Sequence, residues 1–178
     1  VREGLSTDFS MQQLAARAGI STYTTYNLIG NKSTVLFILL NHCIDRIDMS
    51  HVADMRDITP ARYVVVSGIA AANVFTSDGN FFRPLMRFLF GVTDEQHRPA
   101  FMRRAQAYWM GVSGNLALES KGEGAISTFD LAVDFLTHFT GALDAWVHGE
   151  TSDTQFVARI RHGLALRMMI IASAEERT

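Results

Sequence analysis

The side chains best suited to contacting a partner lie between residues 21 and 32. Six consecutive residues after Ser21 can each donate, accept or stack, namely Thr22, Tyr23, Thr24, Thr25, Tyr26 and Asn27. These residue types are poor to moderate helix formers, yet Ser21 is a favourable N-cap and Gly30 follows the run. A helix that keeps hydroxyl and phenol groups despite their low helix propensity is typical of a contact surface.

A second short helix is predicted just before this one. Ser10 and Gln13 have the spacing of a capping box, and Gly19 supplies the positive φ that a helix end often needs. Ser21 then caps the polar helix, and Lys32 opens a third helix. Two short helices joined by a tight turn form a helix-turn-helix pattern, in which the second helix enters the major groove of DNA.

The run Ala15-x3-Gly19-Ile20-Ser21-x4-Tyr26-x5-Lys32 resembles the DNA-binding signature of the tetracycline-repressor (TetR) family. The resemblance covers roughly residues 4–42 and implies that Tyr26 and Lys32 hold phosphates, although Ile29 stands where the family usually has an aromatic residue. It also implies a further helix before Gly4, which this chain would lack in part. The predicted contacts to double-stranded operator DNA are Ser10, Ser21, Thr22, Tyr23, Thr24, Tyr26, Asn27 and Lys32.

The charge of the chain leaves a second interpretation open. The formal net charge is −2, and residues 1–32 carry three basic side chains against two acidic ones. Phosphate binding normally needs a basic surface, although hydroxyls and backbone amides also hold phosphates. The same turn occurs in ordinary helical hairpins. The alternative is therefore a helical ligand-binding or scaffold protein of the same fold that does not bind DNA.

Composition predicts an all-α chain. Hydrophobic residues make up 48% of the 178 residues, and only 3 prolines interrupt them. The lone Cys43 excludes an internal disulfide and favours a cytoplasmic location. No apolar run reaches the ~20 residues of a membrane span, so no membrane partner is expected. We predict a helix-turn-helix DNA-binding domain over 1–46, followed by a larger helical ligand-binding and dimerisation body over 47–178.

Apolar periodicity and breaking residues predict the helices of this body. The expected helices span 33–54, 60–76, 81–90 with an interruption at Pro84, 99–120, 128–147 and 153–174. Residues 77–80 are expected to form a turn and residues 121–124 a break. The helix over 60–76 is apolar on most sides, which predicts a central, buried position.

Catalytic chemistry has weak support. Asp134 and His138, like Asp144 and His148, are four residues apart, a spacing that can share a metal but more often forms a surface pair. No nucleophile elbow, phosphate-binding glycine loop or cofactor fingerprint is present in the sequence. We therefore assign no catalytic residue, metal or cofactor, and we expect that the protein is not an enzyme.

Aromatic and methionine residues crowd the segments 81–90 and 101–110. They are explained either as packed core or as the wall of an apolar pocket, which the family resemblance implies. We predict that an apolar or aromatic small-molecule effector binds there. The predicted ligand-binding residues are Phe88, Tyr108, Trp109, Met110 and Asn115.

The last two helices carry more apolar surface than one buried face needs. The stripe that would be left exposed contains Val133, Leu136, Val147, Leu166, Met169 and Ile170. Large exposed apolar patches mark interfaces, and the family dimerises through these two helices. The resemblance thus implies a homodimer that presents two DNA-binding units to a two-fold operator, more as a repressor than an activator.

Overall fold

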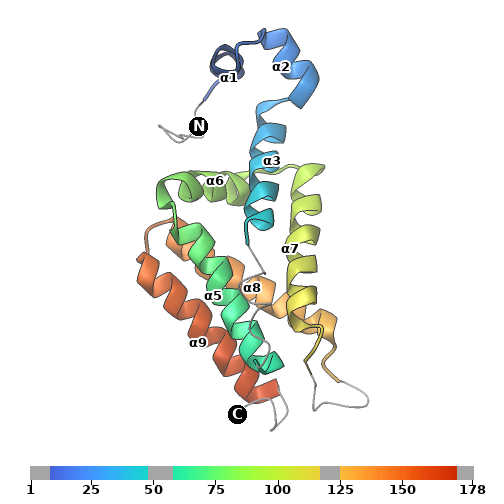
Figure 1. The fold of residues 1–178 in the computed structure, drawn as a ribbon, viewed down its shortest axis with the longest axis vertical. Helices are drawn as coiled ribbons and strands as arrows, with labels where there is room; N and C mark the ends of the chain where they lie inside the picture. The colour runs from blue at the N-terminus through green and yellow to red at the C-terminus, as the bar shows by residue number, and fades with distance from the viewer. Residues whose placement is uncertain (1–8, 48–57, 117–124, 172–178) are drawn as a thin grey trace.

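The computed structural model describes residues 9–47, 58–116 and 125–171, and over these ranges the chain is entirely helical (Figure 1). The helices are α1 (Met11–Ala18), α2 (Thr22–Ile29), α3 (Lys32–Asp45), α5 (Pro60–Thr76), α6 (Gly79–Gly91), α7 (His97–Ser113), α8 (Thr128–Val147) and α9 (Asp153–Ile171). The described residues contain no strand. The predicted all-α class is confirmed.

Helices α1 and α2 form a small pair at one end of the molecule, the top of Figure 1. The Ser10 hydroxyl accepts the Gln13 N–H at 3.1 Å, and the Gln13 side chain accepts the Ser10 N–H at 2.7 Å, so the capping box is present. Gly19 ends α1 with a φ of 68°. The Ser21 hydroxyl then accepts the Thr24 N–H at 3.0 Å and starts α2. We call α1 and α2 the helical pair.

Helix α3 leads from the helical pair to the rest of the molecule, which we call the body (α5–α9). Asn31 caps its start by accepting the Thr34 N–H at 2.9 Å. The prediction that this helix reaches Asp54 is wrong, because the helix ends at Asp45. The chain tightens there into a turn in which Ile47 N–H donates to the Ile44 carbonyl at 3.1 Å. Residues 48–54 lie outside the described ranges.

The bounds of helix α5 match the prediction, and the helix packs against α6, α7 and α9. Val64 and Ala72 are fully buried, whereas Arg62 and Asn73 are exposed, so burial is confined to part of its circumference. Thr59 caps it and Pro60 takes the first position, where its missing N–H has no intrahelical role. It packs along α9 with little space between the backbones. A Cβ at Gly68 would lie 2.2 Å from Leu164 Cδ1, so a larger residue at this position would have to displace the end of the Leu164 side chain.

Helix α6 differs from its prediction at two places. Gly79 and Asn80, expected in a turn, are its first residues, because the Asp78 side chain accepts the Phe81 N–H at 3.2 Å and caps the helix earlier. Pro84 lies inside the helix without interrupting it. Proline cannot donate to the carbonyl four residues earlier, which belongs to Asn80. Asn80 is exposed, so water can satisfy that carbonyl.

Helix α7 starts two residues before the predicted Pro99 and ends at Ser113, not at Ser120. Asp94 sets the start, because its carboxylate accepts the backbone N–H of His97 at 2.6 Å. At the other end, Gly114 and Asn115 form a turn. Residues 117–124, which include the predicted break at 121–124, lie outside the described ranges.

Helices α8 and α9 run antiparallel. Arg167 near the end of α9 pairs with Asp134 near the start of α8, and Trp146 near the end of α8 donates to Asp153 at 2.7 Å. The bounds of α8 match the prediction, and Ser152 and Gln155 exchange the two hydrogen bonds of a capping box before α9. Residues 172–174 at the predicted end of α9 lie outside the described ranges.

The core of the body is aromatic. Trp146 is fully buried and stacks on Phe156 with ring centroids 5.5 Å apart. Phe139 lies between Phe75, Trp109 and Phe156, with centroid separations of 5.7–5.8 Å to each. Rings at these distances and tilts add to the stability gained by burying their area. α3 shares this core through Leu36, Phe37, Leu40 and Cys43.

Candidate nucleic-acid interface and body cavity

Helix α2 turns most of its side chains outward. Tyr23 is 77% exposed, Leu28 is 71% exposed, and Asn27 is exposed beside them. Thr25 is fully buried and donates to the Ser21 carbonyl at 3.1 Å, which fixes the inner face of the helix. At 100° per residue, positions 23, 24, 27 and 28 form one continuous outer face. We call these four residues the outer face of α2.

The predicted DNA contacts fall into two groups. Ser10, Ser21 and Thr24 already use their hydroxyls inside the helical pair, since Ser21 Oγ lies 2.8 Å from Thr24 Oγ1 and Ser10 belongs to the capping box. The side chains of Thr22, Tyr23, Tyr26 and Asn27 make no hydrogen bond to another described residue. The second group is therefore available to a partner. The first group positions the helix.

Lys32 lies at the start of α3, close to the helical pair. Its ammonium is held over the ring of Phe9, 5.1 Å from the ring centroid. A cation–π contact of this kind restrains a flexible side chain without consuming its charge. Tyr26 is 49% exposed and Lys32 is partly exposed, so both can reach an anion outside the helical pair.

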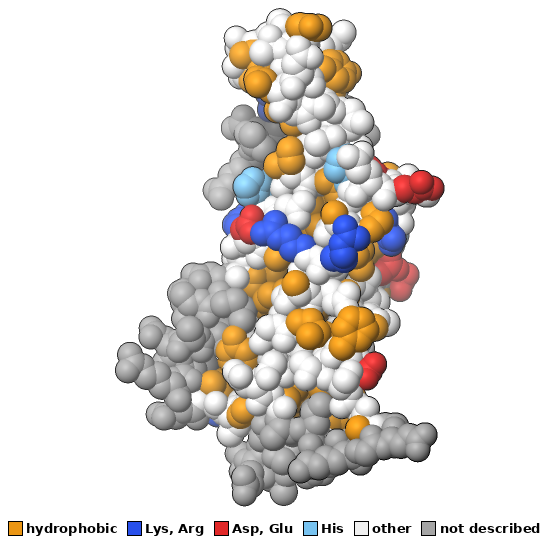
Figure 2. All heavy atoms as spheres, turned by 90° about the vertical axis from the view of Figure 1, so that its right-hand side faces the viewer, with side chains coloured by type: hydrophobic (Ala, Val, Ile, Leu, Met, Phe, Trp, Pro, Cys, Tyr) orange, Lys and Arg blue, Asp and Glu red, His pale blue; other side chains and the backbone are white. Residues whose placement is uncertain are grey.

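The helical pair and α3 carry no acidic side chain until Asp45. Between Phe9 and Ile44 the charged residues are Arg17 and Lys32, both basic. The whole chain has 18 acidic residues, so their absence here leaves a local positive balance on a protein of net charge −2. Figure 2 shows mostly hydrophobic and uncharged side chains at this end of the face in view. Such a surface does not repel a polyanion.

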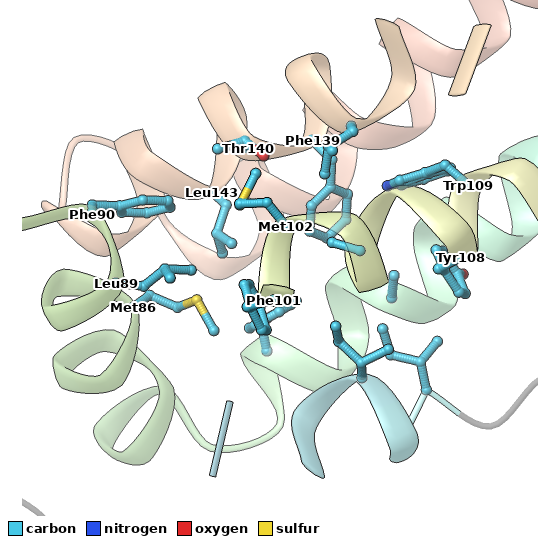
Figure 3. A pocket seen from close by; sticks show the side chains of 16 residues that line it. Met86, Leu89, Phe90, Phe101, Met102, Tyr108, Trp109, Phe139, Thr140 and Leu143 are labelled. Carbon is cyan, nitrogen blue, oxygen red and sulfur yellow. The ribbon is translucent and has the colours of Figure 1, made fainter. Parts of the chain in front are cut away.

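A separate apolar cavity of about 60 Å³ lies in the body. Figure 3 shows its lining side chains converging from α6, α7 and α8. The lining residues are Ile44, Ile47, Ala71, Phe75, Met86, Leu89, Phe90, Phe101, Met102, Ala105, Tyr108, Trp109, Leu136, Phe139, Thr140 and Leu143. None of these residues is charged, so the cavity can hold only a neutral, largely apolar group.

Two hydroxyl groups border this cavity. Tyr108 donates its hydroxyl to the Ser67 carbonyl at 3.0 Å, and burial raises the pKa of this phenol well above its usual value. The phenol is therefore neutral at ordinary pH. Thr140 contributes the second hydroxyl. The Tyr108 hydroxyl is occupied by Ser67, and the surface that lines the cavity is almost wholly apolar.

The predicted ligand residues are placed differently from one another. Tyr108 and Trp109 line the cavity. Phe88 instead meets Phe37 of α3 edge to face, at 5.6 Å between centroids. Met110 packs against the core away from the cavity, and Asn115 is exposed after the end of α7. These three residues therefore do not line the cavity.

The α7 residues of the cavity wall had a signal in the sequence. Phe101, Met102, Ala105, Tyr108 and Trp109 recur at the spacing of one helix face. No sequence pattern predicted the lining residues from α8, such as Leu136 and Thr140. The rotation of one helix against another is set by packing across the core.

The start of α7 ties the body to α3. Asp94 accepts the Ser33 hydroxyl at 2.7 Å, and the His97 ring stacks on Phe37 at 5.4 Å. The His97 backbone N–H, followed by the Ser33 hydroxyl, lowers the pKa of the Asp94 carboxyl to about 2. Farther along, Arg104 pairs with Asp45. The link thus contains one carboxylate at each end of α3, Asp94 beside Ser33 and Asp45 beside Arg104.

The face that carries α7 has a band of basic side chains across its middle (Figure 2). Arg98, Arg103 and Arg104 are exposed, as their predicted position on a solvated face requires. Arg104 nevertheless extends to α3, where it also donates to Asn41 Oδ1 at 3.2 Å.

The two carboxylate–imidazole spacings of α8 behave differently, because Asp134 and His138 bond to other residues whereas Asp144 and His148 pair with each other. Asp134 pairs with Arg167, and His138 Nε2 lies 3.3 Å from the Arg159 carbonyl. Burial, followed by the nearby Arg167 charge, lowers the pKa of His138. Asp144 pairs with His148 at 3.4 Å on the surface. Over the described ranges, no three His, Cys, Asp or Glu side chains gather closely enough to hold a metal ion.

The apolar stripe predicted on the last two helices is only partly exposed. The assignments of Leu136 and Val147 to it were wrong, because Leu136 lines the cavity and Val147 is fully buried. The exposed members are Val133, Leu166, Met169 and Ile170, and Phe129 at 56% exposure joins them. We call these five residues the α8–α9 patch.

Neither a search for membrane-spanning helices nor a comparison with known proteins assigns these sites. Among the described residues, no helix combines the length and hydropathy needed to cross a lipid bilayer. The chain matches no family model, no curated protein and no solved structure.

Proposed function

We propose that this protein is a TetR-like DNA-binding transcriptional regulator, a homodimeric repressor that an apolar small molecule releases from its operator. In this proposal, α2 enters the major groove and the cavity of the body receives the effector. Tyr26 and Lys32 bind phosphates, as the sequence resemblance implies. The enzyme alternative has no support from the cavity, which no acidic or basic side chain lines.

The strongest support is the course of α3. It begins at Lys32, beside α2, and Ile44 in its last turn belongs to the cavity wall, as does Ile47 just beyond its end. One rigid helix therefore touches both proposed sites. A molecule that changes the cavity must also act on α3, and a movement of α3 carries α2 with it.

The small size of the cavity supports the idea that a bound effector moves the side chains of its wall. At about 60 Å³ it is smaller than the ~300–1,000 Å³ typical of small-molecule pockets. Entry of an effector would have to displace parts of the wall. Met86 and Met102 are unbranched and adapt easily, while the stacked aromatic core behind them resists. We infer that part of the displacement is passed to Ile44 and Ile47.

The α8–α9 patch supports dimerisation. The Arg167–Asp134 pair places the start of α8 and the end of α9 at the same level, and each of these helix ends carries exposed apolar residues. A patch of this kind favours a two-fold interface, which would bring two copies of α2 to one DNA duplex.

DNA binding and release form the first test. The protein should shift the duplex from upstream of its own gene in a gel, and N-phenyl-1-naphthylamine, a neutral aromatic probe, should weaken that shift. Tight probe binding with no shift of any duplex would favour the alternative, a ligand-binding protein of this fold without DNA binding.

Assembly is the second test. Leu166→Glu with Ile170→Glu should give monomers in sedimentation experiments, because burying unpaired charge is costly. Ala107→Glu, on the exposed side of α7, is the matched control and should remain dimeric. An intact dimer of the double variant would contradict an interface at the α8–α9 patch.

A further inference from the structure

The outer face of α2 presents an unusual choice of side chains. Tyr23 and Leu28 are each more than 70% exposed and stand on either side of Thr24 and Asn27. Leaving a leucine this exposed on a short helix brings no gain in packing within the monomer. A partner that covers Leu28 would recover its hydrophobic contribution.

The same face lacks the groups that read G·C pairs. Arginine and lysine recognise guanine O6 and N7, and carboxylates accept from cytosine N4. No charged residue occurs between Arg17 and Lys32, so the outer face of α2 has neither kind of group. Thr24 is engaged with Ser21 at 2.8 Å and has less freedom to bond to a base.

The groups that remain match A·T pairs. The Asn27 amide, which has no hydrogen-bond partner among the described residues, can bond to adenine N6 and N7. Leu28 and the edge of the Tyr23 ring offer apolar contact, which suits the C5-methyl group of thymine. The absence of acidic side chains from Phe9 to Ile44 makes this end compatible with the phosphate backbone.

We propose that the outer face of α2 reads A·T-rich half-sites in the major groove, with Leu28 and Tyr23 against thymine methyl groups and Asn27 on adenine. This inference rests on the proposed DNA-binding function and specifies its substrate. At 100° per residue Tyr26 lies on the opposite side of Tyr23 from Leu28, and in this proposal it binds a phosphate and takes no part in the reading.

Selection from a random duplex pool with the full chain provides the first experiment. Repeated gel shifts should enrich half-sites whose central positions are A·T pairs. Enrichment of G·C pairs at those positions would overturn the inference while leaving DNA binding intact. Failure to enrich any sequence would instead count against the proposed function, so the two failures are distinguishable.

Replacing thymine by uracil then removes the methyl group alone. In the selected duplex, each deoxyuridine placed under α2 should weaken binding about fourfold, the effect of one lost methyl contact of ~0.8 kcal/mol. Leu28→Ala should weaken binding to the thymine duplex and abolish the difference between the two duplexes at its position. Equal affinity of the parent protein for both duplexes would overturn the inference.

Ile38→Ala supplies the matched control. Ile38 is 42% exposed on α3 and lies outside the outer face of α2. This variant should retain the full fourfold preference for thymine. A loss of preference equal to that of Leu28→Ala would mean that the effect is not specific to α2, and would also overturn the inference.

Discussion

Tyr23 of α2 and Trp146 of α8 show how differently the two ends of this molecule use large aromatic residues. Tyr23 is 77% exposed, whereas Trp146 is fully buried, stacked on Phe156 and covered by the Arg83 guanidinium at 4.7 Å. The body uses its rings to hold itself together. The helical pair is held by caps and a glycine turn, which leaves its rings free to meet a partner.

The largest expected difference between the two regions is in stability. Trp146→Ala should lower the free energy of unfolding by about 3–5 kcal/mol, since it leaves a cavity and removes one of the two donors to Asp153, the other being Arg83. Tyr23→Ala should change it by less than about 0.5 kcal/mol. Urea unfolding followed by circular dichroism measures both, and similar losses would remove the distinction between the regions.

Filling the cavity should separate ligand binding from stability. Thr140→Met extends an apolar side chain into the space lined by Phe139 and Leu143, and should weaken binding of N-phenyl-1-naphthylamine at least tenfold. Stability should fall by no more than ~1.5 kcal/mol. Fluorescence titration is the measurement.

Ala107→Met is the control for this variant, because Ala107 is on the exposed side of α7. Its probe affinity should equal that of the parent. Gly111 also lies on the outside, where an added Cβ would meet nothing within 4 Å. Unchanged probe binding by Thr140→Met would place the ligand site elsewhere.

On the helical pair, Tyr26→Phe should affect binding alone. Losing one hydrogen bond to a phosphate, worth ~1.5 kcal/mol, should lower affinity about tenfold on every duplex tested. The ring is retained, so the unfolding curve should not move. A loss confined to one DNA sequence would mean that Tyr26 contacts a base instead.

The smallest effect is expected at Asp94, which joins the start of α7 to α3. This effect is a change in stability that depends on pH. The pKa of Asp94 is lowered from 3.8 to about 2 in the folded protein, so its ionised form stabilises the fold above pH ~4. This contribution is lost as the pH falls from about 4 to about 2. Asp94→Asn should therefore be less stable than the parent at pH 7, and the difference should vanish near pH 2.

Asp144→Asn is the control for the link, because Asp144 is exposed and, among the described residues, its carboxylate pairs with His148 at the end of the same helix. The melting temperature, plotted against pH over this range, should give nearly parallel curves for this variant and the parent. A gap between Asp94→Asn and the parent that stays constant with pH would show that the carboxylate charge is not what holds α7 to α3.

Local sequence patterns predicted where helices start more accurately than they predicted which residues line the cavity. Ser10 with Gln13, and Ser21, predicted caps that the structure contains, because a cap depends only on neighbouring residues. The predicted interruption at Pro84 was wrong, because the cost of the missing proline N–H depends on whether water can bond to the Asn80 carbonyl. That exposure is decided by tertiary packing.

The cavity wall was predictable only within single helices. The periodicity of α7 contains Phe101, Met102 and Ala105, but the partners from α3 and α8 depend on how far each helix slides and rotates against the next. The early end of α7 at Ser113 was also missed, because apolar residues continue beyond it to Leu116. Periodicity alone cannot distinguish such a continuation from a packed turn.

The scarcity of charge on the helical pair has a consequence for counterions. From Phe9 to Ile44 the chain offers only Arg17 and Lys32 to phosphates, so two copies would displace about four condensed cations from a duplex. The logarithm of affinity would then fall with the logarithm of salt concentration at a slope of about −3.6. Between 50 and 200 mM salt this is a loss of roughly 10²-fold, against ~10³–10⁵-fold for proteins that make six to ten phosphate contacts. A repressor of this kind would keep much of its occupancy when the ionic strength of its surroundings changes.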